Sequence, residues 1–84
     1  MSKEKITYYA IVGDGRTADS PLGIVRRRES PEFGISDESL HRDLTWHRTG
    51  AIAEWKHGDL MDDLEEVSEE KANEIIEGLR AEFG

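Results

Sequence analysis

The sequence predicts an α+β fold: a three- to four-stranded antiparallel sheet with one C-terminal amphipathic helix packed on a face. Before residue 58 the chain has several short apolar runs typical of strands, and clusters of turn-forming residues separate these runs. After residue 68 the apolar residues follow the period of a helix. Eighty-four residues suffice for one small domain, covering 1–84. We expect residues 5–58 to be mainly β and residues 68–83 to be helical, and we leave open whether residues 1–4 are ordered.

The first strand is predicted over residues 5–13, which are rich in β-branched and aromatic side chains and end at a glycine. Apolar side chains occur at both parities, so we expect this strand in the interior of the sheet. Residues 13–21 contain Gly, Asp, Ser and Pro without periodicity, which predicts a loop. A second strand over residues 22–29 is then naturally antiparallel to the first.

The middle of the chain is predicted as a loop over residues 30–37, followed by a half-buried strand. Ser30-Pro31 and Phe33-Gly34 are loop signals. After this loop, one face of the predicted strand carries the apolar side chains of Leu40, Leu44 and Trp46, and the other face carries polar side chains.

Residues 51–56 have an ambiguous pattern. Ile52 and Trp55 lie three residues apart, which suits a single helical turn as well as a short strand. We prefer the strand and keep the helical turn as the alternative.

The C-terminal segment has the clearest pattern in the chain. Ser68 is placed to cap a helix, and two glutamates in the first turn complement its dipole. Gly78 disfavours the helix by about 1 kcal/mol relative to alanine, and we expect it to allow close packing on the sheet. One apolar stripe comprises Ala72, Ile75, Ile76, Leu79 and Phe83.

Charge is unevenly distributed along the chain. Residues 1–58 hold nine acidic and nine basic side chains, whereas residues 59–84 hold ten acidic and two basic ones, which accounts for the net charge of −8. The chain has no cysteine, which favours a reducing compartment. The N-terminal apolar run is too short for a signal peptide or a membrane helix, so we expect a cytoplasmic protein with no membrane partner.

One motif resembles a nucleotide-binding fingerprint. Gly13-x-Gly15-x-x-Ala18 follows a strand, but Asp19-Ser20-Pro21 leaves no room for the helix that would bind a pyrophosphate. We interpret it as an ordinary glycine turn and expect no cofactor.

The histidines suggest a metal site that the predicted strand rules out. His41 and His47 share a strand face with Asp43, but six extended residues separate them by about 20 Å. His57 could approach either histidine from another strand, but we expect a solvated sheet face.

The arginine triplet is the only concentrated positive charge. On a strand, Arg26 and Arg28 point one way and Arg27 points the other, so no broad basic patch results. Direct nucleic-acid binding is disfavoured in an acidic chain. We expect internal pairing with Glu29, Glu32 or the acidic C-terminal face, and the alternative is that the arginine forks hold a partner's carboxylates or phosphates.

A family resemblance rests on four segments. They are Tyr8-Tyr9-Ala10-Ile11-Val12, Leu22-Gly23-Ile24-Val25-Arg26-Arg27-Arg28, Arg42-Asp43-Leu44-Thr45-Trp46 and Glu66-Val67-Ser68-Glu69-Glu70. In these segments the chain resembles small acidic hypothetical proteins of actinobacteria. The resemblance implies no activity, cofactor or site residue. The opening strand also resembles that of HicB-type antitoxins, but the chain lacks the proline-rich turn, the cysteine and the helix that should follow.

These observations favour a non-enzymatic protein-interaction module. It would bind another protein or itself, as a homodimer, through a sheet edge or through the region of the two tryptophans. One alternative is an acidic decoy that occupies a partner's nucleic-acid-binding surface, and another is a small ligand-binding protein or enzyme. The candidate partner-binding residues are Arg26, Arg28, Trp46 and Trp55.

Overall fold

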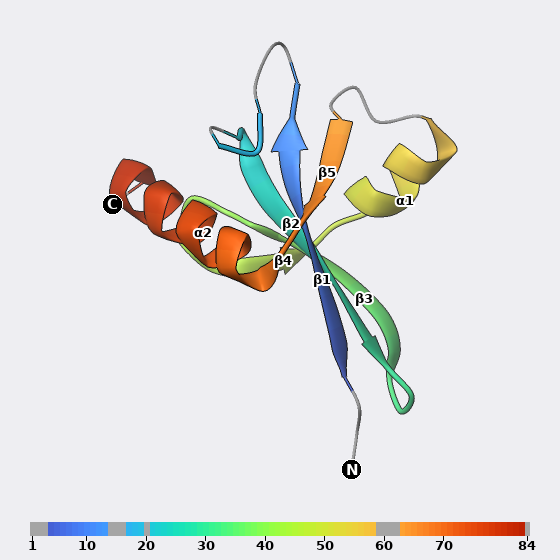
Figure 1. The fold of residues 1–84 in the computed structure, drawn as a ribbon. Helices are drawn as coiled ribbons and strands as arrows, with labels where there is room; N and C mark the ends of the chain where they lie inside the picture. Colours follow the sequence, from blue (N-terminus) through green and yellow to red (C-terminus); the bar gives the residue numbers. More distant parts are fainter. Residues whose placement is uncertain (1–3, 14–16, 20, 59–62, 84) are drawn as a thin grey trace.

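The computed structural model describes residues 4–13, 17–19, 21–58 and 63–83, which form an antiparallel sheet with one helix on each face (Figure 1). The five strands lie in the order β4-β3-β2-β1-β5. The predicted α+β class and antiparallel pairing are confirmed, and the strands are one more than the upper number predicted. The elements are β1 (Lys5–Val12), β2 (Gly23–Ser30), β3 (Gly34–Leu40), β4 (Trp46–Arg48), α1 (Ala51–His57), β5 (Asp63–Val67) and α2 (Glu69–Phe83).

Strands β1 and β2 form the predicted interior of the sheet. They pair in antiparallel register from Lys5 opposite Glu29 to Ile11 opposite Gly23, and each has a further neighbour on its other side. Both faces of this pair must be covered by apolar contacts, because β1 carries apolar side chains at both parities.

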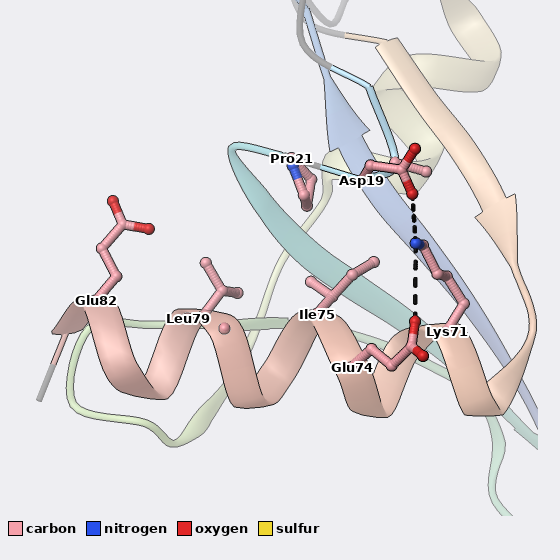
Figure 2. A pocket seen from close by; sticks show the side chains of 9 residues that line it. Asp19, Pro21, Lys71, Glu74, Ile75, Leu79 and Glu82 are labelled. Carbon is pink, nitrogen blue, oxygen red and sulfur yellow. Dashed lines mark hydrogen bonds and ion pairs between the residues drawn. The ribbon is translucent and has the colours of Figure 1, made fainter.

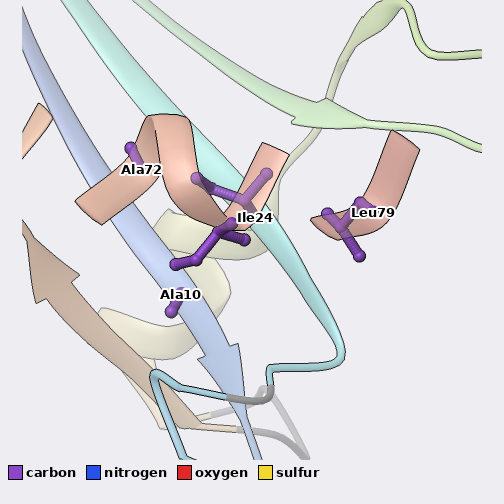
Figure 3. Close-up of a cluster of buried hydrophobic side chains, with 5 residues drawn as sticks. Ala10, Ile24, Ala72 and Leu79 are labelled. Atoms are coloured by element: carbon purple, nitrogen blue, oxygen red, sulfur yellow. The ribbon is translucent and has the colours of Figure 1, made fainter. Parts of the chain in front are cut away.

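Helix α2 covers one face of the sheet. Ala10 and Ile24 from the two interior strands are buried against the helix, where Leu79 contributes to the same cluster (Figure 3). The remaining buried members of this cluster are Ala72 and Ile75. Four members of the predicted stripe, Ala72, Ile75, Ile76 and Leu79, therefore pack on a sheet face as expected, and the Phe83 side chain lies outside what the structure describes.

Helix α1 covers the opposite face, and the preference for a strand over residues 51–56 is wrong. Ile52 is fully buried in a second cluster with Tyr9 and Val25, and Trp55 packs against it from the next helical turn. The helix ends at Gly58, which adopts φ 81°, a conformation that favours glycine. Three-residue spacing places Ile52 and Trp55 on one helical face, so the helical alternative is the correct one.

The predicted loop over residues 30–37 is also wrong in its second half. Only a short turn separates β2 from β3, and the two strands pair from Ser30 opposite Gly34 to Val25 opposite Ser39. Gly34 has φ 78°, which lets the chain reverse direction immediately after the turn. Polar side chains of β3 are stabilised by ion pairs with β2, so the strand needs no apolar alternation of its own.

The predicted continuous strand over residues 40–47 is interrupted. Strand β3 ends at Leu40, and β4 begins at Trp46, directly opposite it. Between them the Leu44 N–H donates to the carbonyl of His41, with Leu44 at φ 62°. The segment is therefore a hairpin turn.

The acidic segment before α2 contains a strand that the sequence pattern did not indicate. Strand β5 pairs with residues 8–12 of β1 and buries Leu64 on the α1 face. Val67, at the other end of the strand, packs against the α2-side cluster.

Helix α2 begins as predicted, because the Ser68 hydroxyl accepts a hydrogen bond from the Lys71 N–H at 3.1 Å. The expected packing role of Gly78 is wrong. Apart from its chain neighbours and the backbone of its own helix, no described heavy atom lies within 4 Å of where a Cβ on Gly78 would stand, so this glycine faces open space. Residues 1–3 and most of the Gly13-x-Gly15 motif lie outside the described residues.

Candidate partner-binding surfaces

The arginine triplet divides between the two faces of the sheet, and its arginines pair with acidic side chains other than those expected. On the α2 face, Arg26 Nε donates to Glu38 Oε1 at 2.9 Å, and Arg28 NH2 donates to Glu4 Oε2 at 2.9 Å. The partners lie on β3 and before β1, so the expected pairing with Glu29, Glu32 or the C-terminal acids is wrong. The hydrogen bond from Arg28 to Glu4 raises the Arg28 pKa.

Arg27 makes the best-formed ion pair of the triplet. On the α1 face its Nε and NH2 atoms donate to the two carboxylate oxygens of Asp37 at 2.8 and 3.0 Å. Only 14% of the Arg27 side chain and 13% of the Asp37 side chain is exposed. The hydrogen bonds to Asp37 raise the Arg27 pKa. The two-pronged geometry holds both side chains rigidly.

Both tryptophans are half-buried against the core, on opposite faces of the sheet. Trp46 packs against the α2-side cluster, and the Arg26 Cζ atom lies 4.0 Å from its ring centroid. Trp55 packs against the α1-side cluster, and its Nε1 donates to Asp63 Oδ1 at 2.6 Å. The structure thus brings Arg26, Arg28 and Trp46 to one face and places Trp55 on the other. Their partner-binding role stays a prediction.

A different part of the sheet exposes apolar side chains. Beyond the two helices, the start of β1 and the β2–β3 hairpin project as a three-stranded ribbon (Figure 1). We call this ribbon, residues 5–7 and 28–36, the distal end. Phe33 is 86% exposed in its turn, Ile35 is 59% exposed on β3, and Ile6 is 38% exposed on β1.

The distal end also has an open strand edge. Strand β4 pairs only with residues 38–40 of β3, and among the described residues no strand lies beside residues 34–36 on that side. The Asp37 carbonyl points to this side, since it accepts a hydrogen bond from the Thr49 N–H at 3.0 Å. Backbone groups alternate along a strand, so the N–H and C=O of Ile35 point the same way. Sequence reasoning missed this edge because it predicted a loop here.

A groove runs between α2 and the wall formed by Ala18, Asp19 and Pro21 (Figure 2). It has a volume of about 290 Å³. One wall is α2, and the other is the segment before β2, which Lys71 ties to the helix through a 2.6 Å contact with Asp19. The lining residues are Ala18, Asp19, Pro21, Lys71, Glu74, Ile75, Gly78, Leu79 and Glu82.

The β3–β4 hairpin brings two histidines together, contrary to the separation of about 20 Å expected of an extended strand. The rings of His41 and His47 stack with centroids 4.1 Å apart. His47 Nε2 lies 3.1 Å from Asp43 Oδ2 and 2.7 Å from the Thr45 hydroxyl. The turn that separates β3 from β4 produces this contact, and the sequence pattern concealed that turn.

This cluster closes the hairpin turn. The Thr45 hydroxyl and N–H both donate to Asp43, and they lower the pKa of that carboxyl to about 2, with a further contribution from His47. Across the described parts of the chain, no group of three or more His, Asp and Glu side chains is arranged to hold a metal ion.

None of the described helices is both long and apolar enough to cross a membrane. Comparison of the chain with protein-family models, with curated proteins and with solved structures gave no significant match.

Proposed function

We propose that the protein is a non-enzymatic interaction module that associates with a second copy of itself through the open edge of β3. The observation that carries this proposal is the combination of unpaired backbone and exposed apolar side chains at the distal end. Phe33 and Ile35 are the two most exposed large apolar residues described.

The sequence of this edge supports pairing with another strand. Natural sheet edges are commonly protected by lysine, proline or an inward-pointing charge. Residues 34–36 read Gly-Ile-Ser and carry none of these devices. An unprotected edge with an apolar side chain is a template for strand addition.

A two-fold axis at Ile35 gives the most favourable antiparallel register. The N–H of each Ile35 would then donate to the C=O of Ile35 in the other copy, and the two Ile35 side chains would lie side by side. In this register Gly34 faces Ser36, so no like charges oppose one another in the paired centre.

The test is sedimentation velocity over a wide range of protein concentration. We expect the average mass to rise from that of one chain toward that of two. Ile35→Lys should keep the chain monomeric, because it places two like charges at the centre of the pairing. Leu22→Lys is the matched control, since Leu22 is also exposed, at 45%, but lies at the other end of β2.

Two results would remove the proposal: a wild-type chain that stays monomeric throughout, or an Ile35→Lys variant that associates like the wild type. Circular dichroism of both lysine variants establishes that each is folded. The distal side chains are exposed, so neither substitution should disturb the core.

The acidic-decoy alternative has less support from the side-chain contacts. Glu74 lies 3.7 Å from Lys71, and Glu77 lies 3.6 Å from Arg80, so two acids of the helix have basic neighbours. A decoy would bind a basic target with an affinity that falls steeply with salt, and a flat salt response would remove this idea.

A further inference from the structure

The groove beside α2 combines an apolar floor with acidic walls. Ile75 and Leu79 contribute the floor, and both side chains are otherwise buried in the core beneath. Gly78 lies between them in sequence and keeps the floor open, since no described atom outside its chain neighbours and its own helix backbone comes within 4 Å of the position a Cβ would take. Pro21 faces the helix from the opposite wall (Figure 2).

The charges around the groove are unbalanced. Its described lining carries three carboxylates, on Asp19, Glu74 and Glu82, against the single ammonium of Lys71. Lys71 Nζ lies 2.6 Å from Asp19 and 3.7 Å from Glu74, so this cation is engaged at one end of the groove. The hydrogen bond from Lys71 lowers the Asp19 pKa, and the same contact raises the Lys71 pKa.

Glu82 lies at the other end of the groove, about three helical turns from Lys71 along α2 (Figure 2). The groove is therefore more negative toward the C-terminal end of the helix. A cation entering there meets a carboxylate beside an apolar floor, whereas an anion is repelled.

The size of the groove narrows the class of ligand. A volume of about 290 Å³ is at the lower limit of the roughly 300–1,000 Å³ typical of small-molecule sites. It is suited to an aliphatic side chain presented by an extended peptide. We infer that the groove binds a peptide segment of a partner protein in which an aliphatic residue is flanked by lysine or arginine.

This inference is independent of the β3 edge, because α2 packs mainly on β1 and β2, whereas the open edge is on β3. Failure of strand pairing would leave the groove intact, and failure of peptide binding would leave the dimer intact. Ile35→Lys should therefore bind peptide as well as the wild type does.

The probe is a capped alanine-based nonapeptide with one leucine between two lysines. Its binding is followed by ¹H–¹⁵N correlation spectra of the full chain. We expect saturable shifts at the amides of Ile75, Gly78 and Leu79. A peptide with glutamates in place of the lysines, and a peptide with glycine in place of the leucine, should each give weaker shifts. Added salt should weaken the binding of the lysine peptide to the groove.

Gly78→Leu separates binding from folding. The new side chain occupies the groove, and we expect the dissociation constant to rise by about tenfold or more, while the melting temperature rises because leucine is the better helix former. Ala81→Leu is the matched control, because Ala81 is exposed on α2 and does not line the groove.

Glu82→Gln tests the charge. We expect binding to weaken by about twofold to fivefold, as for an exposed ion pair. Glu70→Gln, which removes an exposed acid outside the groove, should have a smaller effect. The inference is overturned if the lysine peptide causes no saturable shifts, if the glutamate peptide binds equally well, or if Gly78→Leu binds like the wild type.

Discussion

The guanidinium of Arg26 covers the ring of Trp46, with its Cζ atom 4.0 Å from the ring centroid. The same guanidinium donates to Glu38 across the β2–β3 ladder at 2.9 Å. Trp46 therefore lies between the α2-side core and an arginine that is already held by a carboxylate. This arrangement makes the ring a structural support for β4, the shortest strand of the sheet.

Trp46→Ala should lower the free energy of unfolding by about 2–3 kcal/mol. The expected loss is somewhat below the 3–5 kcal/mol of a fully buried tryptophan, because Trp46 is half-buried. Urea unfolding followed by circular dichroism measures it. Phe33→Ala is the control, measured at a protein concentration low enough to keep the chain monomeric, and should change stability by less than about 0.5 kcal/mol, since Phe33 is 86% exposed. Equal losses in both variants would contradict the role assigned to Trp46.

A double-mutant cycle on Arg27 and Asp37 should give a coupling of about 1–2 kcal/mol. Their two-pronged pair is largely shielded from water, and charge-assisted hydrogen bonds of this kind are stronger than exposed ones. The comparison pair is Arg28 and Glu4, whose side chains are 40% and 36% exposed and should couple more weakly because water screens them. Urea unfolding of the alanine variants yields both couplings, and a reversed order would refute the ranking.

Much of the fold follows from the sequence, because β1 is a continuous run of β-branched and aromatic side chains, turn-forming residues separate it from β2, and α2 keeps one helical period. Strand β3 does not follow, since Asp37 and Glu38 point to opposite faces and are both acidic. Their partners, Arg27 and Arg26, lie on the neighbouring strand, so the stabilising pattern exists only across the ladder. The alternation of apolar and polar residues within a single strand cannot reveal ion pairs between two strands.

The candidate surfaces were predictable only in part. Strand parity correctly placed Arg26 and Arg28 on one face, while the two tryptophans proved to occupy opposite faces. The groove was not predictable, because its walls meet through the contact of Asp19 with Lys71, which are 52 residues apart. Its one sequence signal is a glycine within the apolar stripe of a helix, and the sequence alone favours close packing as the reason for that glycine.

The Asp43 carboxyl should titrate at a pKa of about 2. Thr45 contributes most of this shift, so Thr45→Val should move the pKa back toward its usual value of 3.8. The folded-state pKa is lowered, so the contribution of this contact is present above pH 4 and is lost as the pH falls toward 2. Carboxyl ¹³C chemical shifts report both titrations. An unchanged Asp43 midpoint in Thr45→Val would show that the hydroxyl is not the cause.

Alanine should have opposite effects at two helix-associated glycines. Gly78 is in the middle of α2 with open space around its Cα, so Gly78→Ala should stabilise the fold by about 1 kcal/mol through helix propensity alone. Gly58 also has open space, but it ends α1 at φ 81°, where an alanine Cβ meets its own backbone. Gly58→Ala should therefore destabilise the fold by about 1–2 kcal/mol. Urea unfolding of the two single variants measures both changes in the free energy of unfolding. Both sites have room for a methyl group, so changes of opposite sign would show that backbone conformation, rather than space, decides the outcome.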